Sequence, residues 1–132
     1  MEIIHPEGWK AARGYSNGIV IPADARTLFI AGQIAWNAQQ ELVGRDDFAR
    51  QFAQALDNVV AVVTAAGGTG QDLVQLTVFV TDKQAYLAST RAIGEHWKQT
   101  IGRHYPTMAL VEVADLLEEG ALVEIQGVAA LR

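Results

Sequence analysis

The sequence contains no cysteine, and this absence removes several kinds of chemistry. Disulfide frameworks, zinc sites built on thiolates and cysteine nucleophiles all need a residue type that the chain does not have. Charge is scarce as well, because 19% of the residues are charged and the net charge is −5. No run of lysine or arginine is long enough to follow a phosphate backbone. We therefore expect no nucleic-acid partner and no anionic membrane partner.

Long apolar runs are also missing. No segment approaches the roughly 20 residues that cross a bilayer. The first six residues, Met-Glu-Ile-Ile-His-Pro, lack the basic and apolar regions of a secretion signal. These absences predict a cytoplasmic protein.

Apolar residues, by contrast, are in excess, since half of the 132 residues are hydrophobic. A chain of this length favours a single domain, here spanning residues 1–132. So small a domain, with so few charges, has more apolar surface than it can bury alone. We therefore expect a subunit of an oligomer.

Two short apolar runs separated by a polar turn open the chain. Residues 18–21 end at Pro22, and residues 27–34 follow, a pattern that predicts two strands paired as a hairpin. From Asp46 onward, apolar residues recur every three or four positions as far as Gly67. This spacing predicts an amphipathic helix of about five turns that ends at the glycine.

The second half of the chain predicts one more helix and three more strands. Residues 73–81 alternate in polarity and indicate a strand with one face on the helix. A helix follows Asp82 and closes at Gly102, and two final strands are expected over residues 107–114 and 121–130.

The predicted order is β-hairpin, helix, β, helix, β, β, which favours an α+β fold with two helices on one face of a mostly antiparallel or mixed sheet. The last strands carry apolar residues on both faces, namely Val111, Val113, Val123, Ile125 and Val128. The uncovered face then needs a second sheet, and we expect another copy of the chain to supply it.

Several familiar kinds of site are not indicated. None of the three histidines has the i, i+4 partner of a helical zinc motif, and no metal is expected. Gly67 to Gly70 follow a helix instead of opening one, which is the wrong polarity for a phosphate-binding loop. No cofactor is expected for that reason. The sequence pairs neither Ser16 nor Ser89 with a histidine, so a hydrolase triad is not supported. The histidines are His5, His96 and His104.

Two carboxylates are more informative. Glu112 and Glu124 are each a lone acid within an apolar strand. Burying an unpaired carboxylate costs several kcal/mol or raises its pKa, so each acid has a partner or lines a wet cleft. A structural hydrogen bond or an interface ion pair is the alternative for both. Gln126 lies on the same strand face as Glu124 and adds a polar group to this apolar surface.

Gly32 ends the second strand of the predicted hairpin. A glycine at this position permits close approach by a ligand or by a neighbouring chain. A β-bulge explains it equally well.

Five segments follow one another in an order that is more specific than any one of them: Gly14-Tyr15-Ser16, Leu28 to Ile34, Ala55 to Gly67, Val78 to Asp82, and Pro106 to Ile125. Together they resemble the Rid family, also called RidA/YjgF, the reactive-intermediate deaminases. The resemblance covers nearly the whole chain. It implies a chorismate-mutase-like subunit, a homotrimer whose sheets form a central barrel, and three ligand clefts between subunits. The best-known members hydrolyse enamines and imines such as 2-aminoacrylate to keto acids and ammonia.

The resemblance also implies which residues line the cleft. Tyr15, Gly32 and Glu124 match the family's aromatic, backbone-donor and water-holding positions. Gln33 and Ala109, which adjoin such positions, are expected to bind substrate as well.

Three cleft positions depart from the family pattern. Met108 stands where the family has its carboxylate-binding arginine, and a thioether cannot form the bidentate pair of a guanidinium. Thr90 replaces a frequent asparagine, and Leu110 replaces a cysteine or small polar residue. The cleft is therefore expected to be more apolar than that of a deaminase. Whether one of three nearby cations replaces the arginine stays open; they are Arg13, Arg91 and Arg103.

Two functional hypotheses follow from the resemblance. In the first, the protein is an enamine or imine deaminase in which Glu124 polarises water while Gly32 and a neighbouring N–H stabilise the developing charge. Met108 argues against the usual anionic substrate of the 2-aminoacrylate type. In the second, the protein is a non-catalytic trimer of the same fold that binds a small molecule or has a protective role.

Overall fold

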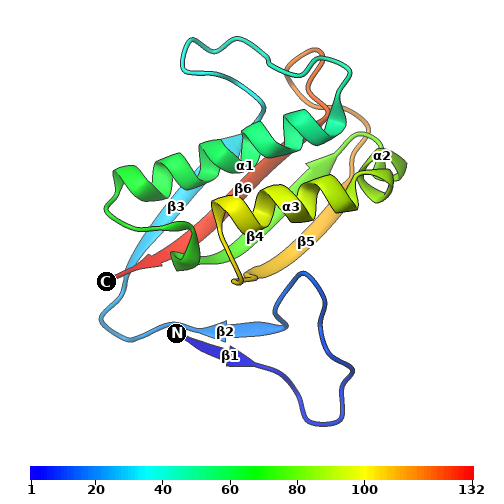
Figure 1. The fold of residues 1–132 in the computed structure, drawn as a ribbon. Coiled ribbons are helices and arrows are strands. Elements are labelled where there is room, and N and C mark those ends of the chain that lie inside the picture. Colours follow the sequence, from blue (N-terminus) through cyan, green and yellow to red (C-terminus); the bar gives the residue numbers. More distant parts are fainter.

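Four strands form one mixed sheet, and the helices cover one of its faces (Figure 1). In this computed structural model, which describes residues 1–132, the strands are β3 (Arg26–Gln33), β4 (Leu73–Val80), β5 (Thr107–Glu112) and β6 (Val123–Leu131). They lie in the order β3-β6-β4-β5. β6 is antiparallel to both of its neighbours, and β4 and β5 are parallel. The predicted α+β class and mixed sheet are confirmed.

The longest helix, α1 (Phe48–Ala65), closely matches the predicted one. It begins after Asp47, whose side chain accepts a hydrogen bond from the backbone N–H of Arg50 at 3.1 Å. This bond satisfies one of the free N–H groups of the first turn. The helix ends before Gly67, whose φ of +93° is a conformation that residues with a Cβ rarely adopt.

The prediction of one helix after Asp82 is wrong, because the segment forms two helices. α2 (Lys83–Ala88) and α3 (Thr90–Thr100) meet at Ser89, which has a φ of −110° and a ψ of 6°. The Ser89 N–H donates to the carbonyl of Tyr86 at 2.9 Å, a tighter turn than that of an α-helix. Both helices lie on the same face of the sheet as α1 (Figure 1).

The predicted hairpin between residues 18–21 and 27–34 is also wrong. β2 (Gly18–Val20) pairs with β1 (Glu2–Ile4) in a separate two-stranded ribbon, and β3 pairs with β6. Both segments are strands as predicted, but the turn at Pro22 carries the chain from the ribbon to the main sheet. β3 has 8 residues to pair, and the 9 residues of β6 offer a longer ladder than the 3 residues of β2.

The core lies between the helices and the sheet. Its fully buried side chains come from α1 and from alternate positions of the central strands; they include Leu56, Val59, Leu76, Val78, Val123 and Ile125. The opposite face of the sheet is uncovered, since Phe29 is 78% exposed and Val111 is 42% exposed. The final strands therefore carry apolar residues on both faces, as predicted.

None of the helices combines the length and the hydrophobicity that a membrane span requires.

Candidate functional site

Glu124 and Gly32 lie side by side on neighbouring strands. Glu124 is the second residue of β6, and Gly32 lies near the end of β3, where the pairing shifts between Ile30 and Gln33. A Cβ atom on Gly32 would lie 2.6 Å from Oε2 of Glu124, closer than such atoms approach in proteins. The bulge therefore explains this glycine, whereas close approach by a ligand or by a neighbouring chain stays a prediction. The approaching group is a side chain of the same chain.

The Glu124 side chain opens onto a pocket of about 290 Å³. It is half-buried and takes part in neither of the two salt bridges of the structure. Gln33, which was predicted to bind substrate, lines this pocket, and three further lining residues were not predicted, namely Trp36, Gln40 and Glu118. These residues lie in loops, where no periodic pattern marks them. An unpaired carboxylate on an open pocket is placed to accept a hydrogen bond from a water molecule.

Gln51 holds the two loops that border this pocket. Its side chain is fully buried in α1, and its Nε2 donates to the carbonyls of Gly44 at 3.2 Å and Gly120 at 3.0 Å. Its Oε1 accepts from the backbone N–H of Leu122 at 2.8 Å. The loop after β3 and the loop before β6 are thereby tied to one helix, which fixes the surroundings of Glu124.

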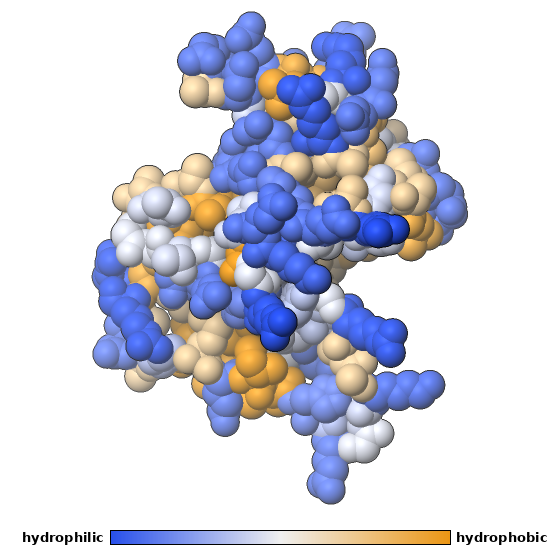
Figure 2. Space-filling model, in the orientation of Figure 1, coloured by the Kyte–Doolittle hydropathy of each residue, from blue (hydrophilic) through white to orange (hydrophobic).

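Met108 and Thr90 lie at a different pocket, of about 250 Å³. α3 and β5 form its walls, and Gly14 reaches it from the N-terminal segment. Figure 2 shows a hollow at the right of the molecule, where the N-terminal segment stands away from the helices. Tyr86 and Trp97 also line this pocket, and the sequence did not indicate them. Burial raises the pKa of the Tyr86 phenol above its ordinary value.

Tyr15 lies at neither of these pockets. It is 44% exposed and lines a hollow in the N-terminal segment with Trp9 and Asn17. The next residue, Ser16, fixes this segment to the main domain, because its backbone N–H donates to the carbonyl of Pro106 at 3.1 Å.

Residues 14–18 also have the Gly-x-Ser-x-Gly spacing of a nucleophile elbow. Such an elbow needs a strand followed by a helix, and here the segment leads into β2. The hydroxyl of Ser16 donates to the carbonyl of Tyr105, and no histidine accepts from it. The spacing therefore does not mark a nucleophile.

Ala109 lies on the uncovered face of β5 and is exposed. Met108, its neighbour, points to the helix side, where it packs against the core. Within one chain, the predicted site residues thus fall into separate groups: Glu124 with Gly32 and Gln33, Thr90 with Met108, Tyr15 by itself, and Ala109 on the open face.

None of Arg13, Arg91 and Arg103 lines the pocket of Met108. Arg91 is almost fully exposed on α3 and pairs with Glu95 at 3.7 Å. Within the single chain, no arginine or lysine therefore lines this pocket.

Glu112 has a structural role. Its Oε1 accepts a hydrogen bond from the backbone N–H of Lys83 at 2.9 Å, so it caps the start of α2 together with Asp82. Of the two lone strand acids, Glu112 thus makes a structural hydrogen bond, which was the alternative considered for both, whereas Glu124 faces a pocket.

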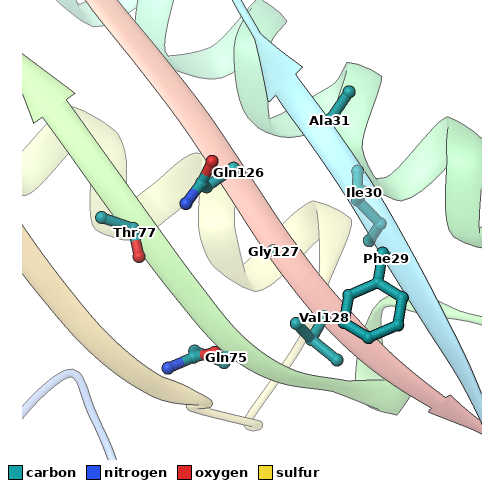
Figure 3. A pocket seen from close by; sticks show the side chains of 8 residues that line it. All are labelled: Phe29, Ile30, Ala31, Gln75, Thr77, Gln126, Gly127 and Val128. Carbon is teal, nitrogen blue, oxygen red and sulfur yellow. The ribbon is translucent and has the colours of Figure 1, made fainter.

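The uncovered face of the sheet carries polar groups among its apolar residues. Gln126 points out of β6 as predicted, and Gln75 and Thr77 of β4 project on the same side (Figure 3). The ring of Phe29 lies beside Val128 in the same view. Together these residues border a shallow hollow of about 440 Å³.

The histidines have structural partners. Nε2 of His96 lies 2.7 Å from Oδ1 of Asp57, and Nε2 of His104 lies 2.6 Å from the carbonyl oxygen of Leu73. Nε2 of His5 lies 3.0 Å from the carbonyl oxygen of Trp9. The structure contains no group of three or more side chains suited to hold a metal ion.

Comparison with known proteins identifies the family. A family model described as endoribonuclease L-PSP matches residues 7–131. A crystal structure of YyfB from Yersinia pestis, a protein of unknown function in the conserved Rid family, is 34% identical, covers 98% of both chains and has a TM-score of 0.86. The Escherichia coli TdcF structure with bound serine is 32% identical over all of both chains, with a TM-score of 0.67. The 2-iminobutanoate/2-iminopropanoate deaminase of Escherichia coli is 36% identical over 80% of each chain.

The chain therefore belongs to this family, the Rid family, and the resemblance of its five ordered segments is confirmed. Relatives in the family are named imine deaminases.

Proposed function

We propose that the protein hydrolyses an enamine or imine to a carbonyl compound and ammonia, with Glu124 as its catalytic residue. The observation that carries this proposal is the position of the Glu124 carboxylate, half-buried over Gly32 and open to a pocket. The names of the deaminase relatives support the reaction class. The net charge of −5 gives no support to an RNA substrate, despite the description of the family model.

The proposed reaction consumes one water per imine. Glu124 accepts a hydrogen bond from the water and takes its proton as the water oxygen bonds to the imine carbon. That proton passes to the nitrogen and gives a carbinolamine, which carries a hydroxyl and an amino group on the same carbon. The hydroxyl proton then passes to the nitrogen as the C–N bond breaks, so ammonia leaves and a carbonyl group remains. The backbone N–H of Gly32 and a neighbouring N–H stabilise the charge that develops during attack.

The complete site is proposed to form between subunits of a homotrimer. Glu124 and Met108 line different pockets of one chain, so a single cleft that holds both needs a neighbouring copy. The exposed apolar residues on the open face of the sheet supply a surface for such a contact. Tyr15 and Ala109 are proposed to join the cleft in the same way.

The substrate is proposed not to be of the 2-aminoacrylate type. Met108 provides no cation for a carboxylate, and none of Arg13, Arg91 and Arg103 reaches its pocket. Loss of a charge-assisted contact removes roughly 1.5–3 kcal/mol, which corresponds to about tenfold to more than hundredfold in affinity.

The test compares ammonia release from 2-aminoacrylate generated in situ and from an enamine without a carboxylate. We expect the second substrate to react faster and Glu124→Gln to slow it by about a hundredfold or more. Glu119→Gln, a change of a nearby exposed acid, is the matched control. Met108→Arg is expected to raise the rate with 2-aminoacrylate. Activity that survives Glu124→Gln would overturn its role, and no ammonia from any imine would indicate a binding protein instead.

A further inference from the structure

The pocket beside Met108 is lined without a single charged residue. Four of its nine lining residues are aromatic, namely Phe52, Tyr86, Trp97 and Tyr105. The other five are two glycines, the aliphatic Ile93, Met108 with its thioether and Thr90 with its hydroxyl. A charged group that entered this pocket would lose its hydration and gain no ion pair.

The aromatic floor of the pocket is held in place by its own contacts. Trp97 is 5% exposed, and its Nε1 donates to the carbonyl of His104 at 3.0 Å. The ring of Tyr105 stacks on Trp97 at a centroid distance of 6.0 Å and an interplanar angle of 12°. Phe52 is 2% exposed, and its ring centroid lies 6.2 Å from that of Tyr86. The pocket therefore presents fixed ring surfaces, which suit an apolar or aromatic group.

Gly94 opens the pocket. It lies in the middle of α3, where glycine is among the poorest helix formers, and its φ is not in the left-handed region. A Cβ at this position would meet no atom within 4 Å. Neither the backbone conformation nor the packing therefore requires glycine at this position. Because Gly94 has no side chain, the pocket is open to solvent here.

We propose that this pocket binds an uncharged apolar group, an aromatic ring or a branched alkyl chain, carried by the substrate. The inference rests on the proposed function and specifies the substrate class for the same site. A dry cavity of about 150 Å³ is enough to bind benzene, and this pocket has about 250 Å³. Met108 thus takes the place of a carboxylate anchor with a surface for hydrophobic contact.

Binding of two matched probes tests the inference without turnover. Phenylacetamide and phenylacetate share a ring and differ in charge, and isothermal titration calorimetry measures both dissociation constants. We expect the amide to bind at least tenfold more tightly than the acid. Gly94→Leu should weaken amide binding at least tenfold by filling the opening. Ala92→Leu, which adds similar bulk at an exposed position of α3, should leave binding unchanged.

Two further variants, Met108→Arg and Glu124→Gln, complete the test. Met108→Arg should reverse the preference toward phenylacetate, and this variant tests the inference even if Gly94→Leu does not fold. Equal binding of the two probes by the unmodified protein, or amide binding that Gly94→Leu leaves intact, would overturn the inference. Glu124→Gln should slow hydrolysis by about a hundredfold or more and retain amide binding. If the amide binds as expected and no imine is hydrolysed, the proposed deaminase activity is refuted, whereas the apolar binding pocket is supported. If Glu124-dependent hydrolysis is unaffected by Gly94→Leu, this inference fails and the proposed function stands.

Discussion

The carboxylate of Glu124 occupies the space that a side chain at position 32 would fill. Because the carboxylate is the far end of a flexible side chain, a methyl group on residue 32 would displace it more readily than it would disturb the backbone. The position of the acid therefore depends on the glycine across the strand pair.

Gly32→Ala is expected to reduce imine hydrolysis by about a hundredfold, since displacement of a catalytic group by about 1 Å can cost that much. The melting temperature should change little. Rate measurements and thermal melts distinguish these effects. Gly18→Ala is the control, because its new Cβ would lie 3.4 Å from that of Ile4, an ordinary contact. Full activity in Gly32→Ala would contradict the role given to this pair.

At the residue scale, the polarity pattern identified the unusual acids but could not separate their roles, and only the family resemblance singled out Glu124. Glu112 and Glu124 show the same pattern of one acid in an apolar strand. Glu112 lies at the end of β5, close to the first turn of α2, and caps it. This difference depends on which elements pack together, and no local pattern records it. The position of Gly94 in the pocket of Met108 was missed for the same reason.

Among the elements, α1 and α3 are joined by a small polar cluster. Oδ1 of Asp57 lies 2.7 Å from Nε2 of His96 and accepts from the hydroxyl of Thr100 at 3.2 Å. The same Nε2 atom of His96 also lies 3.1 Å from the hydroxyl of Thr100. In a catalytic triad the two ring nitrogens contact different partners, so this cluster lacks the geometry of a triad. It holds together the helix that packs on the sheet and the helix that walls the pocket of Met108.

Asp57→Ala is expected to lower the free energy of unfolding by about 1 kcal/mol, because it removes two partly exposed hydrogen bonds. Urea denaturation measures this change. Glu95→Ala, which breaks the exposed pair with Arg91, should cost less, about 0.3 kcal/mol. An Asp57 effect no larger than the Glu95 effect would show that the cluster does not stabilise the helix pair.

Elements were easier to predict than their pairing. Periodicity located α1 and all four strands of the main sheet, because each buries one face and its apolar spacing reflects this. The prediction of a hairpin between the first two runs failed because the partner of β3 is β6, which lies far along the chain. The prediction of one continuous helix after Asp82 failed because the apolar spacing continues across the break at Ser89. Strand pairing and helix bends are set by distant contacts.

For the molecule as a whole, the main asymmetry lies between the two faces of the sheet. Helices cover one face, and the other exposes Phe29 at 78% and Val111 at 42%. A few polar side chains, such as Gln126, interrupt this surface (Figure 3). We expect this open face to be buried in the proposed trimer.

Phe29→Asp is expected to dissociate the trimer, since it would place an unpaired charge in the buried contact. Light scattering should give three times the 14.3 kDa chain mass for the unmodified protein and a smaller species for the variant. Leu87→Asp changes an apolar residue that is 57% exposed on α2, away from the open face, and should remain trimeric. A monomeric unmodified protein at micromolar concentration would refute the proposed assembly.

The central position of β6 has a consequence for how the protein is made. Because β6 is the last strand of the chain and pairs with both β3 and β4, the sheet cannot close until Leu131 has been synthesised. At about 5–20 residues per second, translation from Gln33 to Leu131 takes roughly 5–20 s. During that interval β3 has no partner in the sheet, and its apolar residues, Phe29 among them, are available to chaperones on the nascent chain.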